Sequence, residues 1–292
     1  MATKYEVFLK VVELGSLTQA AEVLGYTQPG VSHVISSMEE EFGFPLLIRS
    51  RAGVRLTDGG ARVMPLLRQL CAGTEQLRQI VSAVSGLEAG TVRVGTFTSV
   101  AVNWLPEMIK DFNALYPNIA FGLFSGDYHD VENWLADSAV DLSFATLPIA
   151  GAQESYPLHE DRLLAVLPKD HELADQPFFP LAELEKQPFI GLLENSSHDL
   201  RRVVKAAGVR PNIRFSIKDD YAILAMVEKG LGITIMPELF LQGRTQNVCV
   251  LPVQGNPTRQ IGLALPGGAA PSPCAARFAQ FVQEWVQRKY AK

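Results

Sequence analysis

The sequence predicts an α/β protein with an α-rich N-terminal unit, a long linker helix and a larger C-terminal domain. Three observations support this division. Residues 16–36 have the pattern of two helices joined by a sharp turn, residues 59–87 repeat apolar side chains at heptad spacing, and strands alternate with helices after Thr91. At 292 residues the chain is long enough to form two hydrophobic cores.

The two N-terminal helices carry clear boundary signals. Gly25 is expected to end the first helix, because glycine adopts the left-handed conformation at little cost. Thr27 can cap the second helix and Pro29 fits its first turn. Its buried stripe is predicted to be Val31, Val34, Ile35 and Met38. Short polar side chains then face outward on a helix that would fit a major groove: Gln28, Ser32, His33 and Ser36. Helix pairs of this kind also occur in all-α domains that bind no DNA.

A short hairpin is predicted directly after the helix pair. It follows the apolar run 46–48, and Gly53 stands near its expected tip. Arg49, Arg51 and Arg55 would reach phosphates from this wing, since residues 42–57 hold three arginines and no acid. The alternative for these arginines is an ordinary solvated surface, but their position after the helix pair favours the wing.

Residues 5–62 resemble the winged helix-turn-helix of LysR-type transcriptional regulators. The matching residues keep the family's order and spacing: Phe8, Gly15-Ser16, Ala20-Ala21, Leu24, Thr27-Gln28-Pro29, Val31-Ser32, Glu39, Gly43, Leu46-Leu47, Arg49, Leu56-Thr57 and Gly60. The resemblance implies a DNA-binding regulator controlled by a small organic acid or another metabolite. By this resemblance Thr27, Gln28, Pro29, Ser32 and Arg49 are expected to face DNA. The full set of expected DNA-facing residues adds Ser16, Thr18, His33, Ser36, Arg51 and Arg55.

Three positions depart from the family pattern. His33 stands where the family usually has arginine or lysine, and a neutral imidazole is a weaker phosphate ligand. Gly30 replaces a typical alanine, at a cost to the helix of about 1 kcal/mol. Ile48 stands where phenylalanine is common.

Residues 61–87 are predicted to form the linker helix. Its apolar seam is Val63, Leu67, Leu70, Thr74, Leu77, Val81 and Val84, widened by Leu66, Cys71 and Ile80. Such a seam either packs on its own domain or joins two copies. The family resemblance implies a homodimer through this helix and favours a homotetramer. Pro65 is a departure, and the helix is expected to begin near it or to bend there.

The C-terminal region resembles the effector domain of the same family, which has two Rossmann-like lobes like a type II periplasmic binding protein. The expected domains are 1–60 for DNA binding, 61–87 for the linker and 91–292 for the effector. The chain would cross between lobes near Glu160 and return near Pro266. Lobe 1 would then contain about 91–160 and 267–292, and lobe 2 about 161–266. Parallel sheets, a helix from Ser99 to about Leu115 and a glycine-led strand over 230–237 are also expected.

An effector site is expected where strands end and helices begin. Thr98, Ser99 and Val100 lie at the start of a helix, where hydroxyl and N–H groups would hold an anion, as in the family; simple capping is the alternative. Further candidates are Thr146 and the loop residues Asn195, Ser196 and Ser197. Asp220 is a weaker candidate, which would disfavour a nearby anion or only cap its helix.

No catalytic residues, metal site or cofactor are predicted. The common hydrolase, phosphate-loop, dinucleotide and zinc-protease motifs are missing, and the five histidines are scattered. Acids such as Glu160 and Asp161 are interpreted as surface residues. The alternative function is a thiol redox-sensing or ligand-binding protein whose N-terminal helices serve assembly, with Cys249 and Cys274 as the candidate pair.

Composition sets the remaining expectations. The net charge is −5, and residues 1–65 hold six basic and seven acidic side chains, so only a local basic edge is expected. No secretion signal and no apolar run of about 18 residues is found, which favours a cytoplasmic protein without a membrane partner. The expected partners are double-stranded DNA, a small-molecule effector, further copies of the chain and RNA polymerase.

Overall fold

The computed structural model describes residues 2–50, 53–84, 89–150, 152–192, 198–267 and 270–291. These residues form two compact units. The first contains the N-terminal 87 positions with Ala136–Ala139, and the second contains the rest. Each unit has hydrophobic core residues of its own.

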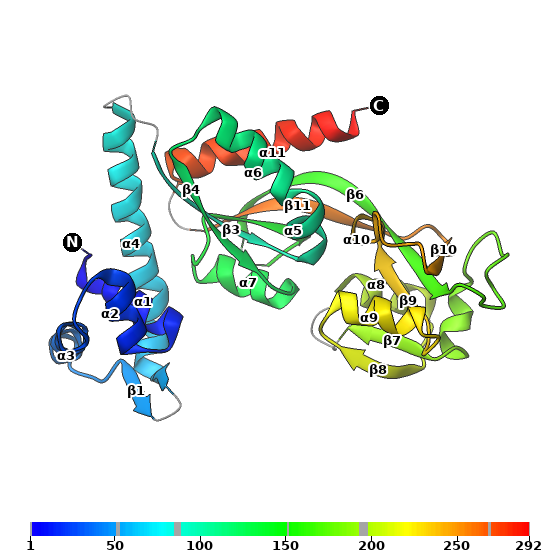
Figure 1. Cartoon of the computed structure of the whole chain (residues 1–292), viewed down its shortest axis with the longest axis horizontal. Helices are drawn as coiled ribbons and strands as arrows, with labels where there is room; N and C mark the ends of the chain where they lie inside the picture. Colours follow the sequence, from blue (N-terminus) through cyan, green and yellow to red (C-terminus); the bar gives the residue numbers. More distant parts are fainter. Residues whose placement is uncertain are drawn as a thin grey trace. The chain divides into compact units, whose positions relative to one another are not determined.

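The first unit consists of three short helices, a hairpin and one long helix (Figure 1). In chain order these are α1 (Lys4–Leu14), α2 (Leu17–Leu24), α3 (Gln28–Phe42), β1 (Leu47–Ser50), β2 (Gly53–Leu56) and α4 (Asp58–Val84). Glycines in the left-handed conformation end the first three helices, at Gly15, Gly25 and Gly43. The predicted helix pair is confirmed: Val31, Ile35 and Met38 are fully buried, and Val34 packs partly buried beside them.

The hairpin is attached to the end of α1. β1 and β2 pair antiparallel, and the Val54 amide donates to the Gly15 carbonyl at 2.8 Å. Gly53 has φ +113°, and a Cβ there would lie 2.9 Å from the Gly15 oxygen. Glycine is therefore required here by close approach as well as by conformation.

Helix α4 begins at Asp58 and contains Pro65, so it does not begin near Pro65. Thr57 supports its first turn, since its hydroxyl accepts from the Gly60 amide at 2.9 Å. The predicted seam divides in two. Leu67 is buried in the core of the first unit, with Val63 partly buried against it. Leu66, Leu70, Leu77, Ile80 and Val81 are exposed. The described seam residues that join the apolar core of their own domain thus lie in the first part of the helix.

The second unit begins with lobe 1, a sheet covered by helices on both faces. Its elements are β3 (Gly90–Thr96), α5 (Thr98–Asn103), α6 (Leu105–Leu115), β4 (Ile119–Ser125), α7 (Tyr128–Ala136), β5 (Leu142–Leu147), the first part of β6 (Ala152–Pro168), β11 (Thr258–Pro266) and α11 (Pro273–Tyr290). Helices α6 and α11 pack against one face of the sheet, in a core cluster that includes Phe112 and Phe278. Helix α7 packs its Val131 and Leu135 into a second cluster with sheet residues.

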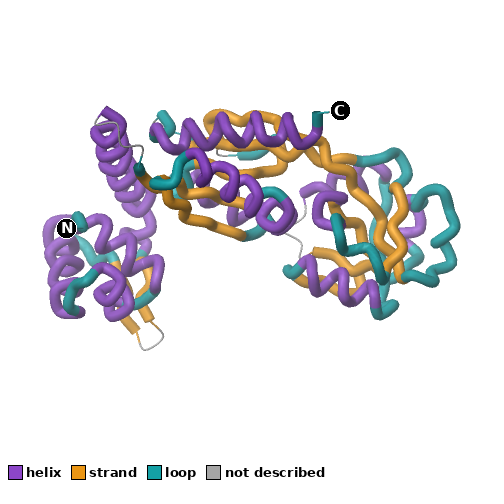
Figure 2. Tube along the Cα trace, turned by 45° about the horizontal axis from the view of Figure 1, so that its top comes forward, coloured by secondary structure: helices purple, strands orange, loops and turns teal. Residues whose placement is uncertain are grey.

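Lobe 2 repeats this layered arrangement on a smaller scale (Figure 2). It contains η1 (Leu181–Glu185), β7 (Phe189–Leu192), α8 (His198–Ala207), β8 (Ile213–Ile217), α9 (Asp220–Glu228), β9 (Thr234–Pro237), α10 (Glu238–Leu241) and β10 (Val248–Pro252). Helix α9 packs in a cluster with Val166 and Met236, whereas α8 packs in another with Leu167 and Phe189.

Strand β6 belongs to both lobes. Up to Arg162 it pairs with β11, and from Leu163 onward with β9 and β10. The first crossing therefore lies at Arg162–Leu163. The chain returns at the start of β11, whose Thr258 pairs with Arg162 and which then pairs with β5. The return thus lies near Thr258, earlier than the expected Pro266, because all of β11 belongs to the lobe 1 sheet.

Other local expectations also differ from the structure. β3 pairs parallel with β4 and β5, but β11 pairs antiparallel with β5 and β6, so the main sheet is mixed. The helix expected from Ser99 to Leu115 breaks at Trp104, where α6 begins with proline in its first turn. The strand expected from Gly230 begins only at Thr234, because Gly230 turns the chain at φ +72°.

Candidate functional site

The N-terminus of α3 presents the residues expected to meet DNA. Thr27 caps the helix, accepting from the Gly30 amide at 3.3 Å, and a proline occupies the first turn. This arrangement leaves Gln28, Pro29 and His33 exposed, with Ser36 exposed one turn further on. The helix therefore begins with an unobstructed polar edge of the kind that contacts bases in a major groove.

The wing arginine is tied to this helix. Arg49 donates from Nη1 to the Ser32 hydroxyl at 2.9 Å, and its Nη2 lies 3.9 Å from Glu39. Glu39 in turn accepts from the backbone amides of Leu46 and Leu47, at 2.8 and 3.1 Å. The Glu39 carboxylate thus holds the base of the hairpin and lies near the Arg49 guanidinium beside α3.

The other expected DNA-facing residues lie on the same unit. Ser16 caps α2 by accepting from the Gln19 amide at 3.3 Å, and Thr18 is exposed on its first turn. Arg55 is exposed on β2. Arg51 lies outside the described residues.

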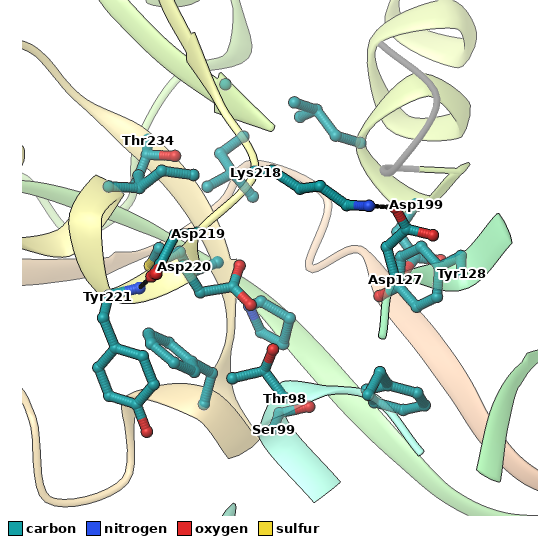
Figure 3. A pocket seen from close by; sticks show the side chains of 18 of the residues that line it. Thr98, Ser99, Asp127, Tyr128, Asp199, Lys218, Asp219, Asp220, Tyr221 and Thr234 are labelled. Carbon is teal, nitrogen blue, oxygen red and sulfur yellow. Dashed lines mark hydrogen bonds and ion pairs between the residues drawn. The ribbon is translucent and has the colours of Figure 1, made fainter. Parts of the chain in front are cut away.

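A second candidate site is a cavity of about 510 Å³ in the second unit, bounded by residues of both lobes (Figure 3). Its volume is in the range of small-molecule sites. Lobe 1 contributes the start of α5 with Thr98 and Ser99, and the start of α7. Lobe 2 contributes α9 and β9, including Asp220 and Thr234.

Arg259 of β11 is the centre of a buried polar network beside the cavity. Its Nε and Nη2 donate to one oxygen of Asp161, at 2.9 and 2.7 Å, and both side chains are 2% exposed. Nη1 donates to the Tyr128 hydroxyl and Nη2 to the Ser99 hydroxyl, both at 2.7 Å. Tyr128 then donates to Asp199 at 3.0 Å, which links lobe 1 to lobe 2.

The network has the electrostatics of a desolvated ion pair. Burial disfavours the charge on Arg259, but the negative groups around it outweigh this effect and raise its pKa. Burial also raises the pKa of Tyr128, so that its hydroxyl stays protonated and can donate to Asp199. Arg259 is therefore a fixed positive charge whose donors are already directed at protein groups.

The structure separates the residues expected to bind an effector. Thr98 and Ser99 line the cavity, and the Ser99 hydroxyl already accepts a hydrogen bond from Arg259. Val100 is fully buried in the lobe 1 core and its side chain does not line the cavity. Thr146 lines a smaller cavity of about 270 Å³ beside Tyr128 and Asp199. Asn195, Ser196 and Ser197 lie outside the described residues.

Two sequence interpretations were wrong in this region. Asp161, taken for a surface acid, is buried against Arg259. Capping of α9 falls to Asp219, which accepts from the amides of Tyr221 and Ala222, and not to Asp220. No local signal marked Arg259, Tyr128 or Lys218 as cavity residues, because the fold brings them together from distant segments.

The cysteines do not form the candidate redox pair. Cys249 packs against the lobe 2 core, whereas Cys274 is buried in the lobe 1 core. The two side chains therefore belong to different hydrophobic clusters, one in each lobe. Burial also raises the pKa of Cys249, which makes its thiol less reactive. Among the described residues no cluster of metal-ligating side chains and no helix able to span a membrane is present.

A winged helix-turn-helix followed by a two-lobed domain with a central cavity defines a class of proteins, the ligand-responsive DNA-binding regulators. Two family models match the chain: the lysR-family bacterial regulatory helix-turn-helix protein over residues 3–61 and the LysR substrate binding domain over residues 85–287. The protein belongs to the LysR family.

Individual proteins show the same likeness. The uncharacterized HTH-type transcriptional regulator YvbU of Bacillus subtilis is 31% identical over 97% of both chains. Full-length CbnR in complex with its target DNA has a TM-score of 0.67 at 20% identity, over 96% of this chain and 98% of that one. The effector binding domain of QuiR in complex with shikimate has a TM-score of 0.63 at 22% identity, over 68% of this chain and 98% of that one.

Proposed function

We propose that this protein regulates transcription by inserting α3 into the major groove of an operator, with Gln28 contacting bases and Arg49 a phosphate. The observation that carries the proposal is the exposed polar start of α3 beside an arginine already oriented by Ser32. A LysR-family fold and a solved relative in complex with its target DNA support the same function. Four further expected DNA-facing residues that are exposed, Thr18, His33, Ser36 and Arg55, would extend this contact surface.

A second copy of the chain belongs to the proposal. Along α4, Leu66, Leu70, Leu77 and Val81 are between 54% and 61% exposed, at spacings of four, seven and four residues. An apolar stripe of this kind favours pairing with an identical helix. Two copies would carry two recognition helices to two half-sites, and further pairing into a tetramer and contact with RNA polymerase complete the proposed assembly.

The inter-lobe cavity is the proposed effector site. A bound small molecule would contact α5 and α7 from lobe 1 and α9 from lobe 2, and would thereby favour one relative position of the lobes. QuiR, a structural relative, holds shikimate in its effector binding domain. The effector must bind two conformations unequally, by about 1–3 kcal/mol, to control DNA binding.

The proposal is tested by fluorescence anisotropy on DNA from upstream of the protein's own gene, with scrambled DNA for comparison. Gln28→Ala should weaken specific binding about tenfold or more and change non-specific binding little, because a bidentate base contact is lost. Gln280→Ala, the same change at an exposed position of α11, is the matched control. Equal losses on both DNAs would refute base reading by Gln28, and no DNA binding at low salt would refute the proposed function.

A further inference from the structure

The charges that line the inter-lobe cavity are unevenly distributed. Among the described residues the lining contains two basic side chains, Lys218 and Arg259. Against these stand five carboxylates: Asp127, Asp130, Asp199, Asp219 and Asp220. The charge that a ligand meets depends on which of these groups are already neutralised by neighbours.

Both basic side chains are engaged by protein groups. Arg259 donates to Asp161, Tyr128 and Ser99 at 2.7–2.9 Å. Lys218 lies 2.9 Å from Asp127 and 3.7 Å from Asp130. Both cations are therefore already paired with protein carboxylates and would have to leave them to bind an anionic ligand.

Most of the carboxylates are engaged as well. Asp127 and Asp130 share Lys218, and each accepts from the other's backbone amide at 2.9 Å. Asp199 accepts from Tyr128 and lies 3.6 Å from Arg202. Asp219 caps α9. Among the described residues, one lining carboxylate then remains that neither pairs with a cation nor caps a helix.

That carboxylate is Asp220. Within the part of the chain that the structure describes it makes no ion pair, and Figure 3 shows it beside Thr98 at the cavity. Burial raises its pKa, while a hydrogen bond from Thr98 and the charge of Arg259 act in the opposite direction. A partly desolvated carboxylate of this kind is costly in the empty site and gains most from a ligand that supplies a positive charge.

We infer that the effector of this regulator carries a cationic group, a protonated amine or an amidine-like group, which pairs with the Asp220 carboxylate between the lobes. The inference rests on the proposed function, since it assigns the chemical class of the ligand for that same cavity. A cation would be held between Asp220 on lobe 2 and the Thr98 hydroxyl on lobe 1. A simple dicarboxylate would instead meet Asp220 and Asp219 without an available arginine.

The test compares two probes of equal length, 1,4-diaminobutane and succinate, on the full-length protein. Calorimetric titration gives affinity and thermal unfolding gives stabilisation, both at low salt and pH 7.5. The diamine should bind and stabilise the wild type, whereas succinate should do neither. Asp220→Asn should weaken diamine binding at least about tenfold, as expected when one partner of a buried charge pair is removed. Glu228→Gln, which removes an exposed charge from the other end of α9, should leave it unchanged.

Each other result overturns the inference. Succinate binding to the wild type that survives Asp220→Asn would show that the cavity accepts an anion without a cation at Asp220. Diamine binding that is insensitive to Asp220→Asn would place the cation elsewhere. If the wild type still prefers its operator but ignores the diamine, the cationic class is wrong and the regulator proposal stands. If operator preference itself is missing, the proposed function fails whatever the probes do.

Discussion

The proposed DNA-facing surface and the inter-lobe cavity are both built from polar side chains. They differ in how far apart in sequence the interacting residues lie. On the first unit, Glu39 and Leu46 are 7 residues apart, and Ser32 and Arg49 are 17 apart. In the cavity, Arg259 and Asp161 are 98 residues apart, and Arg259 and Ser99 are 160 apart. Short separations close at little entropic cost, whereas the cavity network requires both lobes to be folded. The recognition surface is thus a local structure and the cavity a product of the whole domain.

The largest expected effect comes from breaking the long-range network. Arg259→Met should destabilise the second unit by about 3–5 kcal/mol, because it leaves the buried Asp161 charge without its partner. Urea unfolding followed by a probe in the second unit measures this loss. The double variant Arg259→Met with Asp161→Leu should recover most of it, and a single-variant loss below about 1 kcal/mol would contradict a buried ion pair.

A smaller effect is expected at the wing. Arg49→Ala should lower operator affinity about tenfold at low salt and reduce the log–log salt slope by about one, as expected for one lost phosphate contact. Anisotropy at several salt concentrations measures both quantities. Arg277→Ala on α11 is the control, and an unchanged slope for Arg49→Ala would show that Arg49 serves Ser32 and Glu39 alone.

The cap of the recognition helix should have an effect of about 1 kcal/mol. Thr27→Ala removes the acceptor for the Gly30 amide and should destabilise the first unit by that amount. Thr27→Ser retains a hydroxyl and should remain close to the wild type. Hydrogen exchange at Gly30, with thermal unfolding, tests this prediction; equal exchange in all three proteins would rule out a capping role.

The smallest expected effect is a pH dependence in lobe 1. Burial lowers the pKa of His159. Its ring stacks on that of Tyr290, with the two ring centroids 3.9 Å apart. The folded state disfavours the protonated ring. The contribution of His159 to the free energy of unfolding is therefore complete above the unfolded pKa of about 6.5, and it is lost as the pH falls through the lower pKa of the folded state. The second unit should therefore become less stable on acidification, and His159→Phe should flatten the dependence of its free energy of unfolding on pH. An unchanged slope would assign the effect to other groups.

The features that could be predicted from the sequence are those formed by residues close together in the chain. The caps, the glycine turn at Gly25 and the stripe around Ile35 depend on neighbours in sequence, so the helix pair was predictable. The burial of Asp161 was not, because nothing near it in sequence identifies Arg259 as its partner. The same holds for Tyr128, which reaches Asp199 across 71 residues. Thr98 and Ser99, which line the cavity, were predicted as ligand-binding residues because strand ends and helix starts mark ligand sites in α/β folds, and because the family resemblance pointed to the same place.

Strand β6 has a mechanical consequence. Its 17 residues run through both lobes without interruption, so the lobes meet through a strand and not only through loops. A ligand that draws the lobes together must twist this strand at Arg162, where its pairing passes from β11 to β9 and β10. Twisting a hydrogen-bonded ribbon is an elastic deformation, stiffer than swinging about a flexible tether. The domain is therefore suited to converting ligand binding into a small, well-defined rotation.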